Sequence, residues 1–131
     1  MKYRKIGSAY QVQEGFFAET LVKDCPVIRE QYYLRADGKL YIDRYYAWDG
    51  PSGGINTKTF IKSSCVHDVL CELINDASIP VENQPMADKT MLLLNKKAGM
   101  WMPRRLWTYT AVRLYQAKKK HLTGKPKVYE V

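Results

Sequence analysis

The residues of this chain best suited to chemistry lie in one stretch, where a glycine-rich acidic loop runs into a predicted helix. The loop reads Trp48-Asp49-Gly50-Pro51-Ser52-Gly53-Gly54, and adjacent His67 and Asp68 follow it. Glycine has no side chain, so a backbone at Gly50 or Gly53 can come close to a ligand or a metal. Histidine changes charge near neutral pH, which makes His67 a candidate base or ligand. If the chain has a chemical site, we expect it here.

His67 and Asp68 cannot act on each other, because consecutive helical residues point about 100° apart. We expect His67 to face a substrate or water, and Asp68 to face a metal or the Gly50–Gly54 loop. The carboxylate that orients His67 must then come from another element. Asp88 opens the next predicted helix, and antiparallel neighbouring helices commonly pack together. An imidazole held by Asp88 would keep one tautomer and become a better general base.

A structural interpretation of the same residues remains open. His67 would then be a core histidine bonded to the backbone, and Asp49 and Asp68 would be turn or capping residues. The two interpretations differ in one observable property. A catalytic His67 is at least partly exposed in a cleft with Asp88 in hydrogen-bond reach, whereas a structural pair is sealed from solvent.

Several other chemistries fit less well. The only second histidine is His121, which is too few for a dinuclear His-Asp phosphohydrolase. The Gly50–Gly54 loop lacks the Lys-Ser or Lys-Thr of a P-loop, and Ser52 does not stand in a GxSxG sequence. The three cysteines, Cys25, Cys65 and Cys71, form no CxxC pair. We interpret them as buried free thiols in a reducing compartment, rather than as zinc ligands or disulfides.

Strand patterns come first along the chain and helical patterns afterwards. Tyr10–Thr20 is rich in β-formers but interrupted by Gly15, and Gln31–Arg35 and Leu40–Ala47 flank Asp37-Gly38, a strong hairpin signal. Beyond the glycine loop, we predict helices over about 57–75, 86–97 and 103–118, with a loop over 76–85. This order predicts an α+β fold, in which an N-terminal antiparallel β-meander precedes three helices.

The 131 residues are expected to form one domain over 1–117 and a basic tail over 118–131. Within the domain, 1–47 is the β-rich part, 48–56 the glycine-rich loop and 57–117 the helical part. The chain has no apolar run of the ~20 residues that a membrane span needs and no signal-peptide pattern. We therefore expect a cytoplasmic protein with no transmembrane segment.

The formal net charge is +8, and much of the excess lies in the tail. Such a tail attracts nucleic acid or anionic lipid, or it is a solvated segment that maintains solubility. Arg104 and Arg105 could bind a phosphate, or they could pair with acidic residues elsewhere. The tyrosines of 32–46 and Trp48 could form a stacking or membrane-interface surface, or they could pack in the core.

The order of several motifs resembles a phage and prophage family, the domain-of-unknown-function family numbered 1353. The resemblance covers roughly 45–115 and is carried by Asp49-Gly50-Pro51-Ser52-Gly53, Thr57-Lys58-Thr59-Phe60, Ser64, Val66-His67-Asp68, Ala87-Asp88, Arg104-Arg105 and Ala111-Val112-Arg113-Leu114-Tyr115. The family typically has an aromatic residue where this chain has Cys71, and a basic residue near the position of Gln84. The resemblance implies a phage-type protein in the cytoplasm of a bacterial host, and it implies no activity.

A glycine loop, a His-Asp pair on one helix and an Asp on the next are also similar to phospholipase A2-like enzymes. That similarity implies that His67 is the base that activates water and that Asp88 orients it. It also implies that Asp68 and the carbonyls around Gly50 and Gly53 hold calcium, whose preferred ligands are oxygens, and that the ion polarises the ester.

Two functions of different class follow. The first is a hydrolase-like site for an ester or phosphoester, with His67 and Asp88 as catalytic residues. Asp68, Gly50 and Gly53 would hold the cation. Ligand-binding residues would be Trp48, Asp49, Gly50, Ser52, Gly53, Arg104 and Arg105. The second is a non-enzymatic phage-encoded binding protein that acts on a host protein or on an anionic ligand such as a nucleotide.

Overall fold

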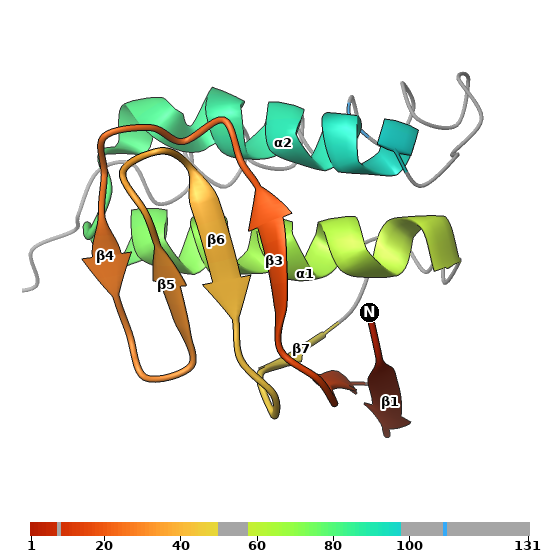
Figure 1. Cartoon of the computed structure of the whole chain (residues 1–131). Helices are drawn as coiled ribbons and strands as arrows, with labels where there is room; N and C mark the ends of the chain where they lie inside the picture. Colours follow the sequence, from red (N-terminus) through yellow and green to blue (C-terminus); the bar gives the residue numbers. More distant parts are fainter. Residues whose placement is uncertain (8, 50–57, 98–108, 110–131) are drawn as a thin grey trace, which may run out of the picture.

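The protein was analysed as a computed structural model, which describes residues 1–7, 9–49, 58–97 and 109. Strands precede helices, as predicted (Figure 1). The strands are β1 (Tyr3–Ile6), β2 (Ala9–Val12), β3 (Phe16–Glu19), β4 (Val27–Ile28), β5 (Tyr32–Leu34), β6 (Lys39–Ile42) and β7 (Ala47–Trp48). The helices are α1 (Lys58–Asn75), the short 3-10 helix η1 (Val81–Asn83) and α2 (Gln84–Lys97).

The strands form two antiparallel sheets, which confirms the α+β class but corrects the single meander. One sheet has the order β1-β2-β7, and the other has the order β3-β6-β5-β4. Residues 13–15, which include Gly15, lie between β2 and β3, and the two strands belong to different sheets. The predicted hairpin joins β5 to β6. Its turn is closed by Asp37 Oδ1, which accepts from the backbone N–H of Lys39 at 3.0 Å, and by Gly38 at φ +91°.

Two α-helices are described, not the three predicted. The prediction for 103–118 falls outside the described residues except at Tyr109, which is helical. Both described helices end where the periodicity indicated, at Asn75 and Lys97. The predicted loop over 76–85 is shorter than expected, because η1 and the first turn of α2 occupy its second half.

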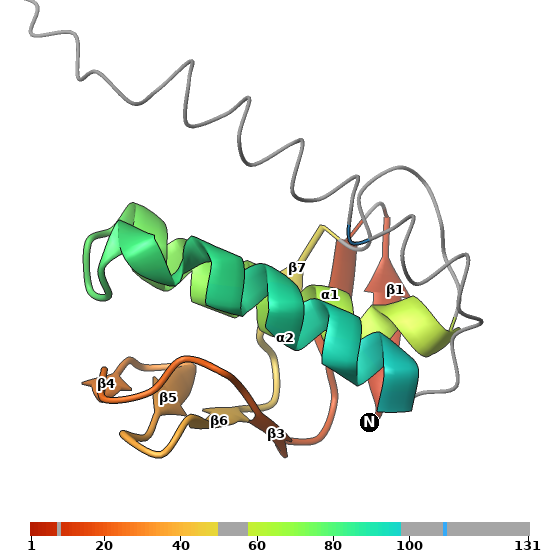
Figure 2. The same ribbon diagram turned by 90° about the horizontal axis from the view of Figure 1, so that it is seen from above.

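The helices form an antiparallel pair that covers one face of the four-stranded sheet (Figures 1 and 2). Strands β1 and β7 lie toward the N-terminal half of α1, and β4 and β5 lie toward its C-terminal half (Figure 2). Helix α1 therefore has neighbours on several sides, which explains why it is apolar around more of its circumference than one stripe requires. Val66, Val69, Leu70 and Leu73 on α1 are all fully buried. Neither α1 nor α2 combines the length and apolar character that a membrane-crossing helix requires.

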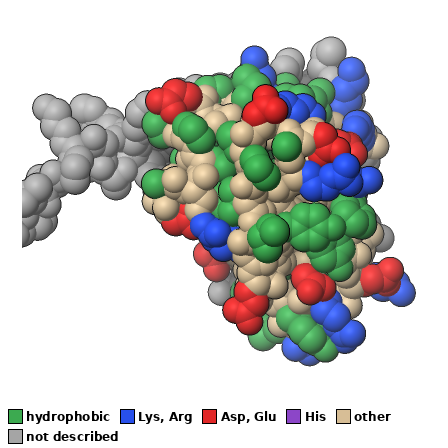
Figure 3. Space-filling model, turned by 60° about the vertical axis from the view of Figure 1, so that its left-hand side comes forward, with side chains coloured by type: hydrophobic (Ala, Val, Ile, Leu, Met, Phe, Trp, Pro, Cys, Tyr) green, Lys and Arg blue, Asp and Glu red, His purple; other side chains and the backbone are tan. Residues whose placement is uncertain are grey.

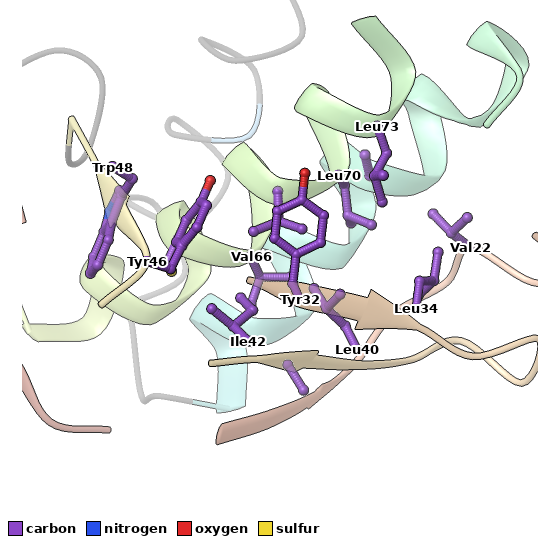
Figure 4. Packing of buried hydrophobic residues seen from close by; sticks show 14 of the residues in the cluster. Val22, Tyr32, Leu34, Leu40, Ile42, Tyr46, Trp48, Val66, Leu70 and Leu73 are labelled. Atoms are coloured by element: carbon purple, nitrogen blue, oxygen red, sulfur yellow. The ribbon is translucent and has the colours of Figure 1, made fainter. Parts of the chain in front are cut away.

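Polar contacts fix the position of α1 against the sheets. Trp48 Nε1 donates to Ser64 Oγ at 3.1 Å, and the hydroxyls of Tyr32 and Tyr46 each donate to the Glu72 carboxylate at 3.0 Å. The side chains of Trp48, Tyr46 and Tyr32 lie side by side along the helix, in that order (Figure 4). Burial raises the pKa of both tyrosines, and the Glu72 charge raises it further, so they remain neutral donors. These contacts set which face of α1 is turned toward α2.

Candidate functional site

The centre of the candidate site is a histidine–carboxylate pair between α1 and α2. His67 Nε2 donates to Asp88 Oδ1 at 2.6 Å. The His67 side chain is 8% exposed and that of Asp88 is fully buried. The predicted juxtaposition of His67 and Asp88 is therefore present, and it is supplied by facing helices as the sequence indicated. The partial exposure expected of a catalytic histidine is not found, because His67 is buried, which is the arrangement expected of a structural pair.

The charge state of His67 is set by two opposing effects. Burial disfavours the charged imidazolium and acts to lower the pKa of His67. The hydrogen bond that His67 donates to Asp88, assisted by the adjacent Cys71, outweighs burial and raises the pKa of His67 to about 10. At neutral pH the pair is consequently an imidazolium bonded to a carboxylate. Neutral imidazole becomes the main form only in alkaline solution.

Two further described side chains, Gln84 and Cys71, lie beside the pair. Gln84 Nε2 donates to Asp88 Oδ1 at 3.0 Å and lies 3.6 Å from Cys71 Sγ. Cys71 Sγ lies 3.7 Å from both ring nitrogens of His67. Gln84 thus holds the carboxylate from its own helix, while Cys71 packs against the imidazole from one turn further along α1.

The position of Cys71 indicates what His67 could and could not do. A sulfur at equal distances from two ring nitrogens does not lie along the lone pair of either one. Cys71 is therefore not placed as a nucleophile that gives its proton to His67, because that transfer needs an aligned hydrogen bond. Nε2 is engaged by Asp88, so Nδ1 is the ring atom at which His67 could accept a proton.

Asp68 is half-buried and faces a different side of α1. After burial itself, the nearby charges of Asp68 and Glu72 contribute to raising the pKa of Cys65, and Asp68 adds to the raised pKa of Tyr46. Asp68 thus lies near Cys65 and Tyr46, and the Gly50–Gly54 loop that it was expected to face lies outside the described residues. Within the described ranges, no three His, Cys, Asp or Glu residues gather in a way that could hold a metal ion.

Of the other predicted ligand-binding residues, the structure describes Trp48 and Asp49. Trp48 is buried, stacks on Tyr10 with ring centroids 5.6 Å apart, and uses its N–H on Ser64, so it anchors β7 to α1. Asp49 is exposed. The remaining predicted residues lie outside the described ranges: Gly50, Ser52, Gly53, Arg104 and Arg105.

Cys71 and Gln84 were not predicted as members of the site, although the spacing could have found them. Each stands four residues from a predicted site residue, Cys71 after His67 and Gln84 before Asp88. Residues four apart on a helix are surface neighbours. All three cysteines are free, as predicted, but Cys71 and Cys25 are half-buried rather than buried.

Comparison of the chain with protein-family models, with curated proteins and with solved structures finds no match in any of the three.

Proposed function

We propose that this protein is a small hydrolase-like protein in which His67 activates water and Asp88 holds the imidazole. The observation that carries the proposal is the bond from His67 Nε2 to Asp88 Oδ1 at 2.6 Å, which leaves Nδ1 as the proton-accepting atom. An ester or phosphoester is the substrate that this chemistry fits best. A phage-type origin and a lipid ester belong to the same proposal through the resemblances described above.

The placement of the pair supports a functional role over a purely stabilising one. Taking two charged groups out of water is costly, and a buried ion pair is often no more stabilising than apolar residues of similar volume. Helices α1 and α2 also bury apolar side chains, among them Leu70, Ala87 and Met91, and a second polar contact, in which Ser63 Oγ donates to Asn95 Oδ1, joins the two helices. A charged pair here has no evident packing advantage. A buried histidine with a raised pKa and a specific carboxylate partner is a recognised mark of a functional site.

The residues would act in the following way. Neutral His67 takes a proton from water at Nδ1 while the water oxygen attacks the ester carbonyl carbon. Asp88 stabilises the imidazolium that forms, and the proton then passes to the leaving alcohol as the ester bond breaks. Because the pKa of His67 is about 10, the rate should rise with pH as the neutral form becomes populated.

A calcium ion, if bound, would polarise the carbonyl and stabilise the oxyanion. Asp68 is the described member of the oxygen donor set that would hold it, and its carboxylate chemistry suits calcium. The other proposed donors, around Gly50 and Gly53, lie outside the described residues.

One observation favours the second candidate function, a non-enzymatic binding protein. The His67 side chain is almost enclosed, which is the arrangement expected of a structural pair. In that case the pair would lock α1 to α2, and the protein would act through its surface on a host protein or an anionic ligand.

The decisive experiment compares wild type with His67→Gln and Glu72→Gln on chromogenic carboxylic ester and phosphoester substrates, with calcium and with a chelator. Glutamine at 67 can still donate to Asp88 but cannot act as a base. Glu72→Gln is the matched control, since it changes a hydrogen-bonded carboxylate on the same helix without touching His67.

Hydrolysis that is present in wild type and Glu72→Gln but lost in a folded His67→Gln supports the enzyme. Wild-type hydrolysis should also increase between pH 7 and about 9, on the lower flank of a pKa near 10. No hydrolysis of either substrate class by wild type, or equal hydrolysis by His67→Gln, overturns the enzyme and leaves the binding protein.

A further inference from the structure

The outer face of the four-stranded sheet carries a continuous row of large hydrophobic side chains. Phe17 pairs with Tyr41 across β3 and β6, Tyr41 with Tyr33 across β6 and β5, and Tyr33 with Ile28 across β5 and β4. The row therefore crosses all four strands in register. Its members alternate along the strands with buried Ala18, Leu40 and Leu34, whose side chains face the core.

This row is exposed rather than covered by the helices, which lie on the opposite face (Figure 2). Phe17 is 48% exposed and Ile28 is 82% exposed, while Tyr33 and Tyr41 are half-buried by one another. The ring centroids of Phe17 and Tyr41 are 4.9 Å apart, and those of Tyr33 and Tyr41 are 5.3 Å apart. Scattered exposed hydrophobic residues need no explanation, but a contiguous patch marks an interaction surface.

The charges beside the row are of both signs and are arranged asymmetrically. Two residues further along the strands on one side lie two basic residues and one acidic residue: Lys39 is next to Arg35 across β6 and β5 and opposite Glu19 across β6 and β3. Lys39 Nζ lies 4.9 Å from the centroid of Phe17. On the opposite side of the hydrophobic row lies Asp43, the first residue after the end of β6. Figure 3 shows hydrophobic side chains gathered on the surface with both basic and acidic side chains at their border.

This border identifies the class of partner. A nucleic acid or an anionic membrane requires a surface of one sign, and the carboxylates of Glu19 and Asp43 beside the row oppose such a ligand. An aromatic and aliphatic centre with a mixed polar rim is the composition of a protein–protein interface. The partner must offer a hydrophobic strip with an acid on one side and a base on the other.

The same face of a second copy meets this requirement. We propose that two copies of this chain associate through this sheet face, with a two-fold axis parallel to the row. A rotation about that axis lays one hydrophobic row on the other and exchanges the two borders. Lys39 of each copy then faces Asp43 of the other, so each pair forms twice, as in other isologous dimers.

The size of the face predicts weak association. Three strand spacings of about 4.8 Å by three or four residues at about 3.4 Å give a footprint of roughly 150–200 Å² per copy, which is below the ~600 Å² per partner at the low end of stable interfaces. A contact of this size should be weak and transient, with a dissociation constant on the order of 100 μM or more. The dimer should therefore form at high protein concentration and separate on dilution.

Sedimentation velocity of the full chain tests the proposal, at about 5 μM and about 500 μM, which lie on either side of about 100 μM. The variants are Phe17→Asp, Lys39→Asp, Asp43→Lys and the double charge exchange Lys39→Asp with Asp43→Lys. Lys96→Asp reverses an exposed charge on α2, away from the sheet face, and is the matched control. Thermal unfolding of each variant verifies that it is folded.

Wild type and Lys96→Asp should move from monomer toward dimer over this hundredfold range of concentration. Phe17→Asp and each single charge reversal should remain monomeric, and the double exchange should restore dimerisation. Wild type that is monomeric at the higher concentration overturns the proposal. So does dimerisation that Phe17→Asp leaves unchanged, or a double exchange no better than the single reversals. Hydrolysis assays are independent of these outcomes, so failure here leaves the proposed function untouched.

Discussion

Replacement of Asp88 by alanine should strongly destabilise the protein, because it removes the carboxylate that faces a buried imidazolium. Asp88 is fully buried, and it accepts from His67 Nε2 at 2.6 Å and from Gln84 Nε2 at 3.0 Å. Both donors would lose this acceptor. Solvent cannot easily replace it, since the His67 side chain is nearly enclosed.

Two estimates of the magnitude agree. Removal of one partner from a buried ion pair typically costs about 3–5 kcal/mol. The rise in the pKa of His67 from 6.5 to about 10 corresponds to roughly 5 kcal/mol of preference for the protonated form in the folded state. His67 can limit the loss by releasing its proton when Asp88 is absent, so we expect about 3 kcal/mol at pH 7. That is a large share of the roughly 5–15 kcal/mol that typically stabilises a domain.

The pH dependence has a definite sign. A group with a raised folded-state pKa contributes its full stability below the unfolded-state pKa and loses it as the pH rises through the folded-state pKa. The contribution of the pair is therefore complete below pH 6.5 and declines toward pH 10. The difference in stability between wild type and Asp88→Ala should shrink steadily over this window.

Urea unfolding followed by tryptophan fluorescence, at several values between about pH 6 and pH 9.5, measures this difference. The exposed carboxylate Asp76, which pairs loosely with Arg29 at 3.6 Å, provides the control, and Asp76→Asn, which keeps the acceptor for the backbone N–H of Ser78, should change stability little. A loss below about 1 kcal/mol for Asp88→Ala at pH 7 would refute the reasoning, because it lies in the range of a surface ion pair. A difference that stays constant from pH 6.5 to 9.5 would show that the pair is not charged.

Three other outcomes follow from the same structure. If calcium binds beside Asp68, the thermal midpoint of wild type should rise with calcium concentration and that of Asp68→Asn should not; equal midpoints with and without calcium in wild type would contradict the proposed ion. Gly38→Ala should destabilise the protein by about 1–3 kcal/mol, because Gly38 has φ +91° and an added Cβ would lie 2.6 Å from the carbonyl oxygen of Thr20. Chemical denaturation measures this loss, and an unchanged unfolding midpoint would contradict it. Trp48→Phe removes the donor to Ser64 and should cost about 1–3 kcal/mol while α1 stays helical by circular dichroism; a loss of helix signal would mean that this contact is needed for α1 to form.

Local patterns in the sequence predicted the central hairpin and the two described helices, but not β1, β4 or the break between β6 and β7. Asp37-Gly38 between two β-rich runs predicted the β5–β6 hairpin, because glycine adopts the backbone conformation that the turn demands. The helical periodicity and the position of Asp88 predicted that α1 and α2 would pack together. Adjacent His67 and Asp68 were expected to point apart, because that follows from helix geometry alone.

What the sequence did not reveal depends on contacts between distant segments. Local propensity does not specify partners, so the division of the strands into two sheets, with β7 returning to β2, emerged only in the fold. The same holds for Trp48, which looked like a ligand-binding residue and is an anchor for α1.

The sequence by itself determined which residue types are present and that His67 and Asp88 stand on neighbouring helices. Only the tertiary structure decided their environment. A histidine has no fixed pKa of its own in a protein, because burial and a partner 21 positions away in the chain shift it in opposite directions. The enclosure of His67 and the row across the outer sheet face both result from packing, to which residues far apart in the sequence contribute together.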